Sequence, residues 1–401
     1  MKTVIVAGGG ASGMAAALSA AASPENRVIL LERQARVGRK LLSTGNGRCN
    51  LTNRNCSPSH YHGEEASFVM PVLSSCTPEE VLSWFRSLGL VCTEQADGRV
   101  YPLSDFASSV LDVLRYALDG AGVSVQTGES VLSASRKGSQ FQVVTEKASY
   151  RADALIIACG GKAGGKVGGV ADGYNLLCAF GHRCSRLHPA LVPVHTDTDY
   201  PRALKGIRTD AGIRLLNGSA LLAEACGELQ FTEKGVSGPA IFDVSRAAAI
   251  NGGELELDFL RSLSRGEVLS LLQQRRAASP ALEAGNAFVG ILQSRLSTVV
   301  VKAASVRPSA LMKELSDADL SRMADRAKAF RLRVTGTDSF DTAQVTAGGI
   351  LTEDFSPDTL ESRLVPGLFA CGEVLDIDGD CGGYNLQWAW ASGIRAGRLA
   401  K

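Results

Sequence analysis

The stretch MKTVIVAGGGASG, residues 1–13, decides the fold of this chain. A short apolar strand runs directly into glycines at positions 8, 10 and 13, which form the G-x-G-x-x-G pattern of dinucleotide-binding proteins. In this pattern Gly8 permits a tight turn, Gly10 lets the backbone approach a pyrophosphate, and Gly13 lets the next helix pack closely on the strand. A helix predicted over 15–22 then directs its N-terminal N–H groups at the phosphates.

A matching acid follows at the expected distance. A second predicted strand, Arg27 to Leu31, ends at Glu32, about 20 residues after the glycines, where a carboxylate binds the adenosine ribose. The alternatives are a glycine-rich turn in another kind of α/β protein and an exposed carboxylate at a strand end. Strand, glycines, alanine-rich helix, strand and acid together predict an α/β, Rossmann-like dinucleotide site.

Length and composition limit the class of protein. A chain of 401 residues predicts two or three domains. The 42 Lys and Arg residues nearly balance the 41 Asp and Glu residues, which argues against nucleic acid as the main partner. We expect neither a membrane span nor a signal peptide, and therefore a cytoplasmic protein. The ten cysteines form no C-x-x-C pair, so we expect buried, reduced thiols, for example Cys159 and Cys178.

The first half of the chain alternates between strand and helix patterns. Thr77 is predicted to cap a helix over 78–88, and Ser104 or Asp105 to cap the next helix, which runs to about residue 118. Short strands are predicted over 123–126, 131–134, 141–145 and 149–151. The continuous apolar run 154–158 is typical of a central parallel strand.

The character of the sequence changes after Pro189 and returns near the end. Strand-like pieces over 213–216 and 254–259 precede a helical stretch over 264–330. The segment 368–373 is again a strand that ends in glycine and an acid, followed by a helix predicted over 385–399. If both ends of the chain bind one cofactor, the middle third is an insertion.

Three features favour FAD over NAD alone. Arg39 and Lys40, in a turn after Glu32, supply cations for the pyrophosphate. The Ala-Cys-Gly step that ends at Gly160 resembles the Ala-Thr-Gly turn of two-domain flavoproteins. The step from Gly372 to Glu373 resembles their Gly-Asp step, in which the acid holds a ribityl hydroxyl. Together these features resemble the glutathione-reductase-type flavoprotein fold.

Longer motifs carry a closer resemblance. They are GRK at 38–40, STGNGRCNLTN at 43–53, GVSGP at 235–239, VTAGG at 345–349 and GEVLD…GGYNLQWAW at 372–390. The chain is similar, from residue 4 to residue 397, to the bacterial NAD(P)/FAD-dependent oxidoreductases of the aminoacetone-oxidase-like family, which includes a dehydro-bile-acid reductase. Cys159 stands where a threonine is usual, and 166–171 is irregular where the family has a Gly-Ser-Thr-Gly run.

The resemblance implies a discontinuous FAD-binding domain over 1–190 and 340–401. It also implies a β-rich insert over 191–262 plus about 331–339, and a helical part over 263–330. Val131 is then placed where such folds clamp adenine through backbone groups. The predicted cofactor-binding residues are Gly8, Gly10, Ala11, Ser12, Gly13, Glu32, Arg39, Lys40, Val131, Gly160, Gly372, Glu373, Asn385 and Leu386.

Asn385 and Leu386 open the last predicted helix behind two glycines. Such a helix start, aimed at the N1–C2=O edge of the flavin, stabilises the anionic reduced ring by about 0.3–2 kcal/mol. This raises the reduction potential and favours acceptance of a hydride. Plain helix capping is the alternative for these residues.

No catalytic acid or base stands out; Tyr384 and Arg48 are the candidates, and Tyr384 could equally serve in packing. Cys49, beside Arg48, could have a lowered pKa, but no second cysteine lies nearby in sequence. His60-x-His62 lacks further ligands, so no metal site is predicted. Trp388 and Trp390 lie on different helix faces and are assigned to the core.

The predicted function is hydride transfer through FAD between NAD(P)H and a small or medium organic substrate, with a conjugated carbonyl compound as one version. NAD(P)H would bind transiently, because no second glycine fingerprint is present. One alternative is an amine oxidase that uses oxygen. Another is a non-catalytic flavin-binding subunit, for example of an RNA-modifying assembly. The sequence does not determine the oligomeric state.

Overall fold

A computed structural model describes residues 1–399. The chain divides into two compact units, each with its own apolar core. Unit 1 comprises Met1–Pro189 and Phe340–Lys401, and unit 2 comprises Ala190–Ser339. Both ends of the chain therefore belong to unit 1.

The centre of unit 1 is a sheet in the strand order β20-β11-β1-β2-β7, and every pairing in it is parallel. Val4, Ile5 and Val6 are fully buried, because helices cover both faces of such a sheet. This strand order confirms the predicted α/β Rossmann-like fold. The strands are β1 (Lys2–Ala7), β2 (Asn26–Glu32), β7 (Ser124–Thr127), β11 (Ala154–Ile157) and β20 (Leu368–Ala370).

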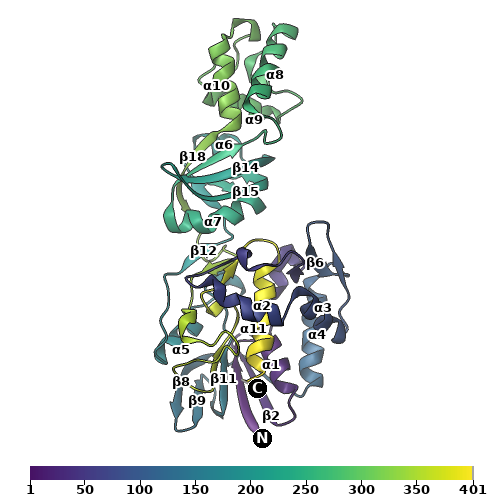
Figure 1. Ribbon diagram of the computed structural model, residues 1–401, viewed down its shortest axis with the longest axis vertical. Helices are drawn as coiled ribbons and strands as arrows, with labels where there is room; N and C mark the ends of the chain where they lie inside the picture. The colour runs from purple at the N-terminus through teal and green to yellow at the C-terminus, as the bar shows by residue number, and fades with distance from the viewer. Residues whose placement is uncertain (400–401) are drawn as a thin grey trace. The chain divides into compact units, whose positions relative to one another are not determined.

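Helices α1 and α11 lie side by side although they come from opposite ends of the chain (Figure 1). Small residues allow this close packing: a Cβ on Gly393 would lie 2.3 Å from the Ser12 carbonyl oxygen, and one on Gly397 would lie 2.4 Å from that of Ala16. The helices of unit 1 are α1 (Ala11–Ala21), α2 (Val69–Ser75), α3 (Pro78–Ser87), α4 (Ala107–Gly120), α5 (Asp172–Ala179) and α11 (Tyr384–Gly397).

Smaller sheets surround the central one. One has the order β10-β9-β8, one has β3-β6-β5, and two are strand pairs, β21 with β4 and β12 with β19. Their bounds are β3 (Thr52–Asn53), β4 (Tyr61–His62), β5 (Cys92–Glu94), β6 (Arg99–Pro102), β8 (Val131–Lys137), β9 (Gln140–Thr145), β10 (Ser149–Ala152), β12 (His188–Ala190), β19 (Val345–Ala347) and β21 (Asp378–Gly379).

The helix ends test the capping predictions. Thr77 caps α3 in a reciprocal capping box with Glu80, as predicted. The prediction for α4 is wrong: Phe106 occupies the N-cap without a side-chain bond, since Ser104 bonds the hydroxyl of Ser109 and Asp105 turns toward Arg48. Helix α1 begins at Ala11 rather than at residue 15, and α11 spans Tyr384–Gly397 rather than 385–399.

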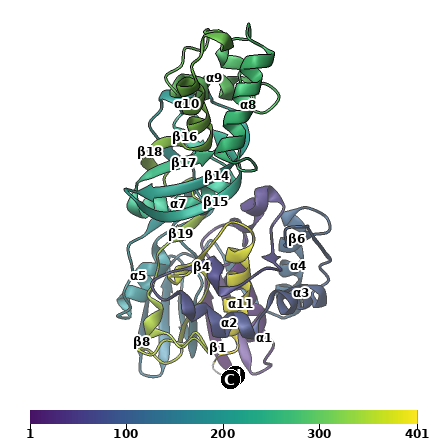
Figure 2. The same ribbon diagram turned by 45° about the horizontal axis from the view of Figure 1, so that its top comes forward.

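Unit 2 contains a closed barrel in the strand order β13-β16-β15-β14-β17-β18. Two long strands, β14 and β15, form its main hairpin, and β14 is much longer than the stretch 213–216 predicted for it (Figure 2). The strands are β13 (Val194–Thr196), β14 (Arg208–Asn217), β15 (Ala220–Phe231), β16 (Gly235–Ser237), β17 (Glu254–Asp258) and β18 (Phe330–Thr337).

The helical stretch of unit 2 forms where it was predicted, between β17 and β18. Ser264 and Ser316 begin α8 and α10 with capping boxes. Helix α7 was not predicted, because the sequence there was assigned to the β-rich insert. The helices are α6 (Asp199–Ala203), α7 (Pro239–Asn251), α8 (Arg265–Ala278), α9 (Ser294–Ala303) and α10 (Asp317–Lys328). One apolar core joins these helices to the barrel.

Two general expectations can be compared with the structure. All ten cysteines are unbridged, but Cys178, Cys184 and Cys226 are exposed, so the predicted burial is wrong for these three. Across residues 1–399, no helix combines the length and the apolar character that crossing a bilayer requires.

Candidate functional site

The predicted cofactor residues gather at one edge of the central sheet. Because the strands are parallel, their carboxyl ends share an edge, and the loops after β1, β2, β11 and β20 all emerge there. The glycine turn follows β1, Glu32 ends β2, Gly160 follows β11 and Gly372 follows β20. Residues more than 350 positions apart thus meet at one site.

The glycine turn has the geometry that its sequence pattern requires. Gly8 has φ +110°, and a Cβ there would lie 2.4 Å from the carbonyl oxygen of Ala158. A Cβ on Gly13 would lie 1.8 Å from the Gly8 oxygen. At Gly10, by contrast, a Cβ would meet no atom within 4 Å. Two glycines are therefore required by packing, whereas Gly10 borders open space.

That open space faces the N-terminus of α1. Gly10 is the N-cap, and the first N–H bonded inside the helix is that of Met14, 3.0 Å from the Gly10 oxygen. The N–H groups of Ala11 and Ser12 lie in the first turn, which holds unpaired donors in any α-helix. A pyrophosphate fits this helix N-terminus, because the N–H donors and the positive end of the helix dipole both favour binding of an anion.

Glu32 lies beside this turn and is half-buried. Its Oε2 accepts the Gly9 N–H at 2.8 Å, and its Oε1 accepts the Gln34 N–H at 2.7 Å. Two backbone bonds fix the carboxylate, which retains lone pairs for a further donor such as a ribose hydroxyl. The geometry fits the predicted role of Glu32.

The two predicted cations lie differently. Lys40 Nζ forms an ion pair with Glu373 Oε2 at 2.7 Å, and Glu373 Oε1 accepts the Thr346 N–H at 2.8 Å. Arg39 is exposed and donates to the Gln34 side chain at 2.9 Å. Lys40 and Glu373 thus occupy one polar cluster, whereas the contact of Arg39 with a pyrophosphate stays a prediction.

The remaining cofactor candidates border the same edge. Val131 is the first residue of β8 and pairs with Thr145, and nearby the Glu129 N–H donates to the Glu32 carbonyl at 2.9 Å. Gly160 has φ +73° and open space where a Cβ would stand. Gly372 has φ +76°, and a Cβ there would lie 2.4 Å from the Ser12 hydroxyl.

Helix α11 begins behind Gly383, which has φ +104°. The Asn385 side chain accepts the Gly379 N–H at 2.8 Å and donates to the Gly379 carbonyl at 2.7 Å, so it braces the preceding loop. Leu386 is half-buried. The Asn385 side chain therefore holds the preceding loop, and the first-turn N–H groups of α11 have no acceptor within the helix.

Asn50, which the sequence analysis did not single out, lies against this helix start. It is only 8% exposed, and its Oδ1 has no hydrogen-bond partner in the described part of the chain. That oxygen lies 2.9 Å from where a Cβ of Gly383 would stand. A buried acceptor without a donor is costly, so it indicates a missing donor group.

These observations fit FAD. The ring edge of a flavin offers an N–H donor beside a carbonyl, which matches the Asn50 acceptor beside the N–H groups of the first turn of α11. The pyrophosphate matches the space at Gly10, and the ribose matches Glu32. Nothing in the sequence flagged Asn50 beyond its place in a polar loop.

The candidate groups beside Asn50 have structural partners. Arg48 pairs with Asp105 and stacks over the Tyr101 ring at 4.1 Å. Burial raises the pKa of Cys49 to about 12, although a hydrogen bond with Thr44 lowers it. The suggestion of a lowered pKa for Cys49 is therefore wrong, because desolvation disfavours the thiolate.

The structure completes the histidine pair in an unexpected way. His60 Nδ1 lies 3.0 Å from Asp380 Oδ2, and His62 Nε2 lies 2.7 Å from Asp380 Oδ1. The His60 ring stacks on Tyr384 with centroids 4.2 Å apart. A carboxylate thus joins the pair from 318 residues away, yet none of the described His, Cys, Asp and Glu groups has an arrangement for a metal.

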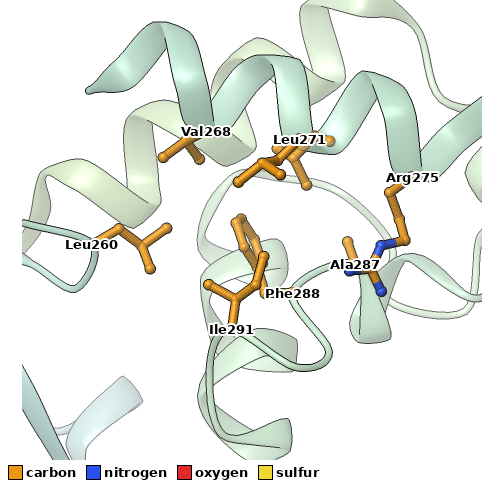
Figure 3. A pocket seen from close by; sticks show the side chains of 8 residues that line it. Leu260, Val268, Leu271, Arg275, Ala287, Phe288 and Ile291 are labelled. Carbon is orange, nitrogen blue, oxygen red and sulfur yellow. The ribbon is translucent and has the colours of Figure 1, made fainter. Parts of the chain in front are cut away.

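Two hollows are lined by residues of unit 2 alone. One lies between α8 and the turn around Phe288, and Leu271 and Ile291 point into it (Figure 3). Its volume of about 10 Å³ holds at most one water. Another hollow, of about 290 Å³, is lined by Arg331 paired to Glu254. The smaller cavity is too narrow for a substrate. In the larger one the charges of Arg331 and Glu254 neutralise each other in an ion pair.

Comparisons with known proteins identify the family of this chain. The family described as HI0933-like protein Rossmann domain matches residues 2–399. The 3-dehydro-bile acid delta(4,6)-reductase of Clostridium scindens is 39% identical over 406 residues, covering 100% of this chain and 99% of that protein. The ribosomal RNA dihydrouridine synthase of Escherichia coli is 29% identical over 393 residues, covering 97% of this chain and 95% of that protein.

A solved structure gives a weaker likeness. The 3-ketosteroid delta1-dehydrogenase from Sterolibacterium denitrificans, in complex with 1,4-androstadiene-3,17-dione, covers 99% of both chains at 12% identity, with a TM-score of 0.49.

Proposed function

The chain belongs to the HI0933-like family of FAD-binding Rossmann proteins and is an FAD-dependent oxidoreductase, and from this premise we propose that it reduces a carbon–carbon double bond conjugated to a carbonyl group. The predicted resemblance to FAD-dependent oxidoreductases is thereby confirmed. The proposed electron donor is NADH or NADPH, which binds transiently, and the proposed substrate is a small or medium organic molecule.

The chemistry shared by the relatives supports the reaction type. The Clostridium scindens relative is named for a delta(4,6)-reduction of a 3-dehydro-bile acid, and the Escherichia coli relative for dihydrouridine synthesis in ribosomal RNA. In both kinds of substrate the double bond is conjugated to a carbonyl. The single observation that carries the small-molecule version is the 39% identity to the bile acid reductase over the whole chain.

Each part of the site would bind a different part of FAD. The first turn of α1 and the backbone at Gly10 would bind the pyrophosphate, and Glu32 would hold the adenosine ribose. Asn50 and the start of α11 would orient the flavin edge. When bound, FAD accepts two electrons with a hydride and passes them on. The protein thus supplies orientation and electrostatics for the transfer.

Anaerobic stopped-flow absorbance tests this proposal in two separate steps. FAD-loaded protein is first mixed with NADH or NADPH, and the loss of the yellow absorbance is followed. The reduced protein is then mixed with a 3-oxo-4,6-diene steroid, and the product is analysed by mass spectrometry. We expect fast bleaching by one nicotinamide, return of the colour with the steroid, and a product richer by two hydrogen atoms.

Other outcomes point elsewhere. Bleaching by an amine such as aminoacetone, with reoxidation by oxygen alone, would favour an amine oxidase. Reoxidation by ribosomal RNA with formation of dihydrouridine would favour an RNA-modifying enzyme, the activity named for the relatives at 28–29% identity. Folded, FAD-loaded protein that no nicotinamide and no amine reduces would contradict the proposal and favour a flavin-binding subunit.

A further inference from the structure

One titratable cluster stands beside the start of α11 without a part in binding the cofactor. It consists of His60, His62 and Asp380, with the ring of Tyr384 against His60, and is called the histidine–aspartate cluster below. Reduction of a conjugated double bond consumes a hydride and also a proton. The glycine turn, Glu32 and Asn50 supply neither acid nor base for this second requirement.

We infer that His60 is the proton donor for the substrate and that Asp380 and His62 position it. This inference rests on the proposed function. A hydride with its two electrons, derived from the reduced nicotinamide, forms the bond at the β-carbon, and the π electrons move onto the carbonyl as an enolate. The N–H bond of the His60 imidazolium then breaks, a C–H bond forms at the α-carbon, and neutral imidazole recovers a proton from water.

The backbone holds the cluster at the helix start. Strands β4 and β21 pair antiparallel, with His62 opposite Asp378, and the Asp380 N–H donates to the His60 carbonyl at 3.0 Å. Asn385 on the first turn of α11 donates to the Asp380 carbonyl at 3.3 Å. The loop that carries Asp380 is thus tied both to the histidine strand and to the helix that faces the proposed flavin edge.

The geometry suits a proton donor. Asp380 uses one oxygen for each imidazole, so each ring has one nitrogen fixed and keeps the other for a different partner. Stacking on Tyr384 fixes the plane of His60. The two imidazoles are 33% and 36% exposed, which gives water access for reprotonation. Imidazole is the side chain best matched to acid catalysis near neutral pH.

Asp380 is the carboxylate that both imidazoles contact. Burial alone would raise the pKa of Asp380, but hydrogen bonds from His62 and His60 hold it below the ordinary value. Asp380 is therefore the acceptor that holds one nitrogen of each imidazole in place. Further titratable groups stand on the adjoining segments. Burial raises the pKa of Tyr61, which is bonded to Cys56, and Tyr384, Cys381 and the aspartates 376 and 378 have partners of their own. Glu64 follows the histidine strand, and its N–H donates to the Asp376 carboxylate.

A matched pair elsewhere provides the control. His195 in unit 2 also pairs with a carboxylate, Asp338, at 2.5 Å, but it belongs to the barrel. His60→Gln and His195→Gln therefore remove the same kind of side chain from the same kind of partner. His62→Gln and Asp380→Asn test the positioning roles.

The activity test follows single-turnover reoxidation of the reduced, FAD-loaded enzyme by a 3-oxo-4,6-diene steroid over a range of pH. The wild-type rate should fall toward alkaline pH, since the donor must be protonated. H60Q should lower the rate by about 10²–10⁴-fold and lose this pH dependence. Reduction of the flavin by NADH or NADPH should be unchanged in H60Q, and H195Q should behave as wild type in both steps.

A second readout does not depend on the flavin. In the FAD-free protein, proton NMR should show slowly exchanging ring N–H signals for His60 and His62, assigned with the glutamine variants. D380N should remove both signals and leave the signal of His195 in place. A cluster that carries protons on its imidazoles requires these bonds in solution.

The outcomes separate the two proposals. Wild-type protein that is not reoxidised by the steroid defeats the proposed function and this inference with it. Wild-type turnover together with an H60Q rate and pH profile equal to wild type overturns this inference alone. Loss of turnover in H60Q without any change in the shape of the pH profile indicates a structural role, and it also overturns the assignment.

Discussion

Gly8 and Gly10 lie in the same turn, and replacing each by alanine should test a different property. The exchange at Gly8 tests folding, and the exchange at Gly10 tests cofactor binding. Gly8 has φ +110°, and a Cβ there would lie 2.4 Å from the Ala158 oxygen and 2.7 Å from its carbonyl carbon. At Gly10 φ is −79°, and a Cβ would meet no atom within 4 Å. We therefore expect Gly8→Ala to destabilise the protein, and Gly10→Ala to weaken FAD binding without harming the fold.

The magnitudes follow from these contacts. In G8A, the left-handed backbone of the alanine and the overlap of its Cβ with rigid backbone each cost about 1–3 kcal/mol. The free energy of unfolding should therefore fall by about 2–6 kcal/mol. In a unit of this size that corresponds to a drop in Tm of about 5–20 °C. For G10A, stability should change by less than about 1 kcal/mol. Displacing a phosphate from backbone donors should cost about 1.5–3 kcal/mol, a loss of about 10–150-fold in FAD affinity.

The assay uses FAD-free protein. Thermal unfolding followed by circular dichroism gives Tm, and titration with FAD, followed by quenching of its fluorescence, gives Kd. Gly122→Ala is the matched control: its φ is +68°, but a Cβ there would meet nothing within 4 Å. It should show only the backbone cost of about 1–2 kcal/mol, so its difference from G8A measures the overlap.

Two results would refute this reasoning. Folded G10A with the FAD affinity of wild type would show that the pyrophosphate does not lie at Gly10. A G8A protein no less stable than G122A would show that the loop after β11 yields at little cost, contrary to the close packing seen at this edge.

Further predictions concern single groups. Glu32→Gln should lower the affinity for FAD by about 10–150-fold, because charge-assisted bonds contribute about 1.5–3 kcal/mol. FMN, which lacks the adenosine ribose, should bind as before. Glu25→Gln, at an exposed carboxylate, is the control, and titration calorimetry measures both affinities. The folded-state pKa of Asp380 lies below the unfolded value, so the stability it adds is present at neutral pH and is lost as pH falls through the folded value. Urea unfolding should therefore show a stability difference between wild type and D380N that shrinks below about pH 4, and a constant difference would contradict this. Because burial raises the pKa of Cys49 to about 12, iodoacetamide at neutral pH should label exposed Cys226 and leave Cys49 unmodified, as peptide mass mapping can check.

The local sequence determined the nucleotide half of the site. Gly8 and Gly13 are glycines because the backbone of neighbouring segments leaves no room for a Cβ, and Glu32 ends its strand at the distance set by one helix and one turn. The Gly13 contact and the spacing to Glu32 are constraints within about 30 residues, and periodicity and spacing express them directly. The carbonyl that leaves no room for a Cβ at Gly8 belongs to Ala158, which only the fold brings there. The capping box at Thr77 is of the same kind.

Only the tertiary structure decided which distant groups meet. The partners of Asp380 are His60 and His62, more than 300 residues away, and Lys40 pairs with Glu373. The orphaned oxygen of Asn50 becomes visible only once Gly383 stands beside it. Closure of the barrel is likewise a matter of pairing between strands far apart in sequence. Pairs of side chains this far apart in the sequence form only when the fold brings their strands and loops together. A pattern of neighbouring residues in the sequence gives no information about such pairs.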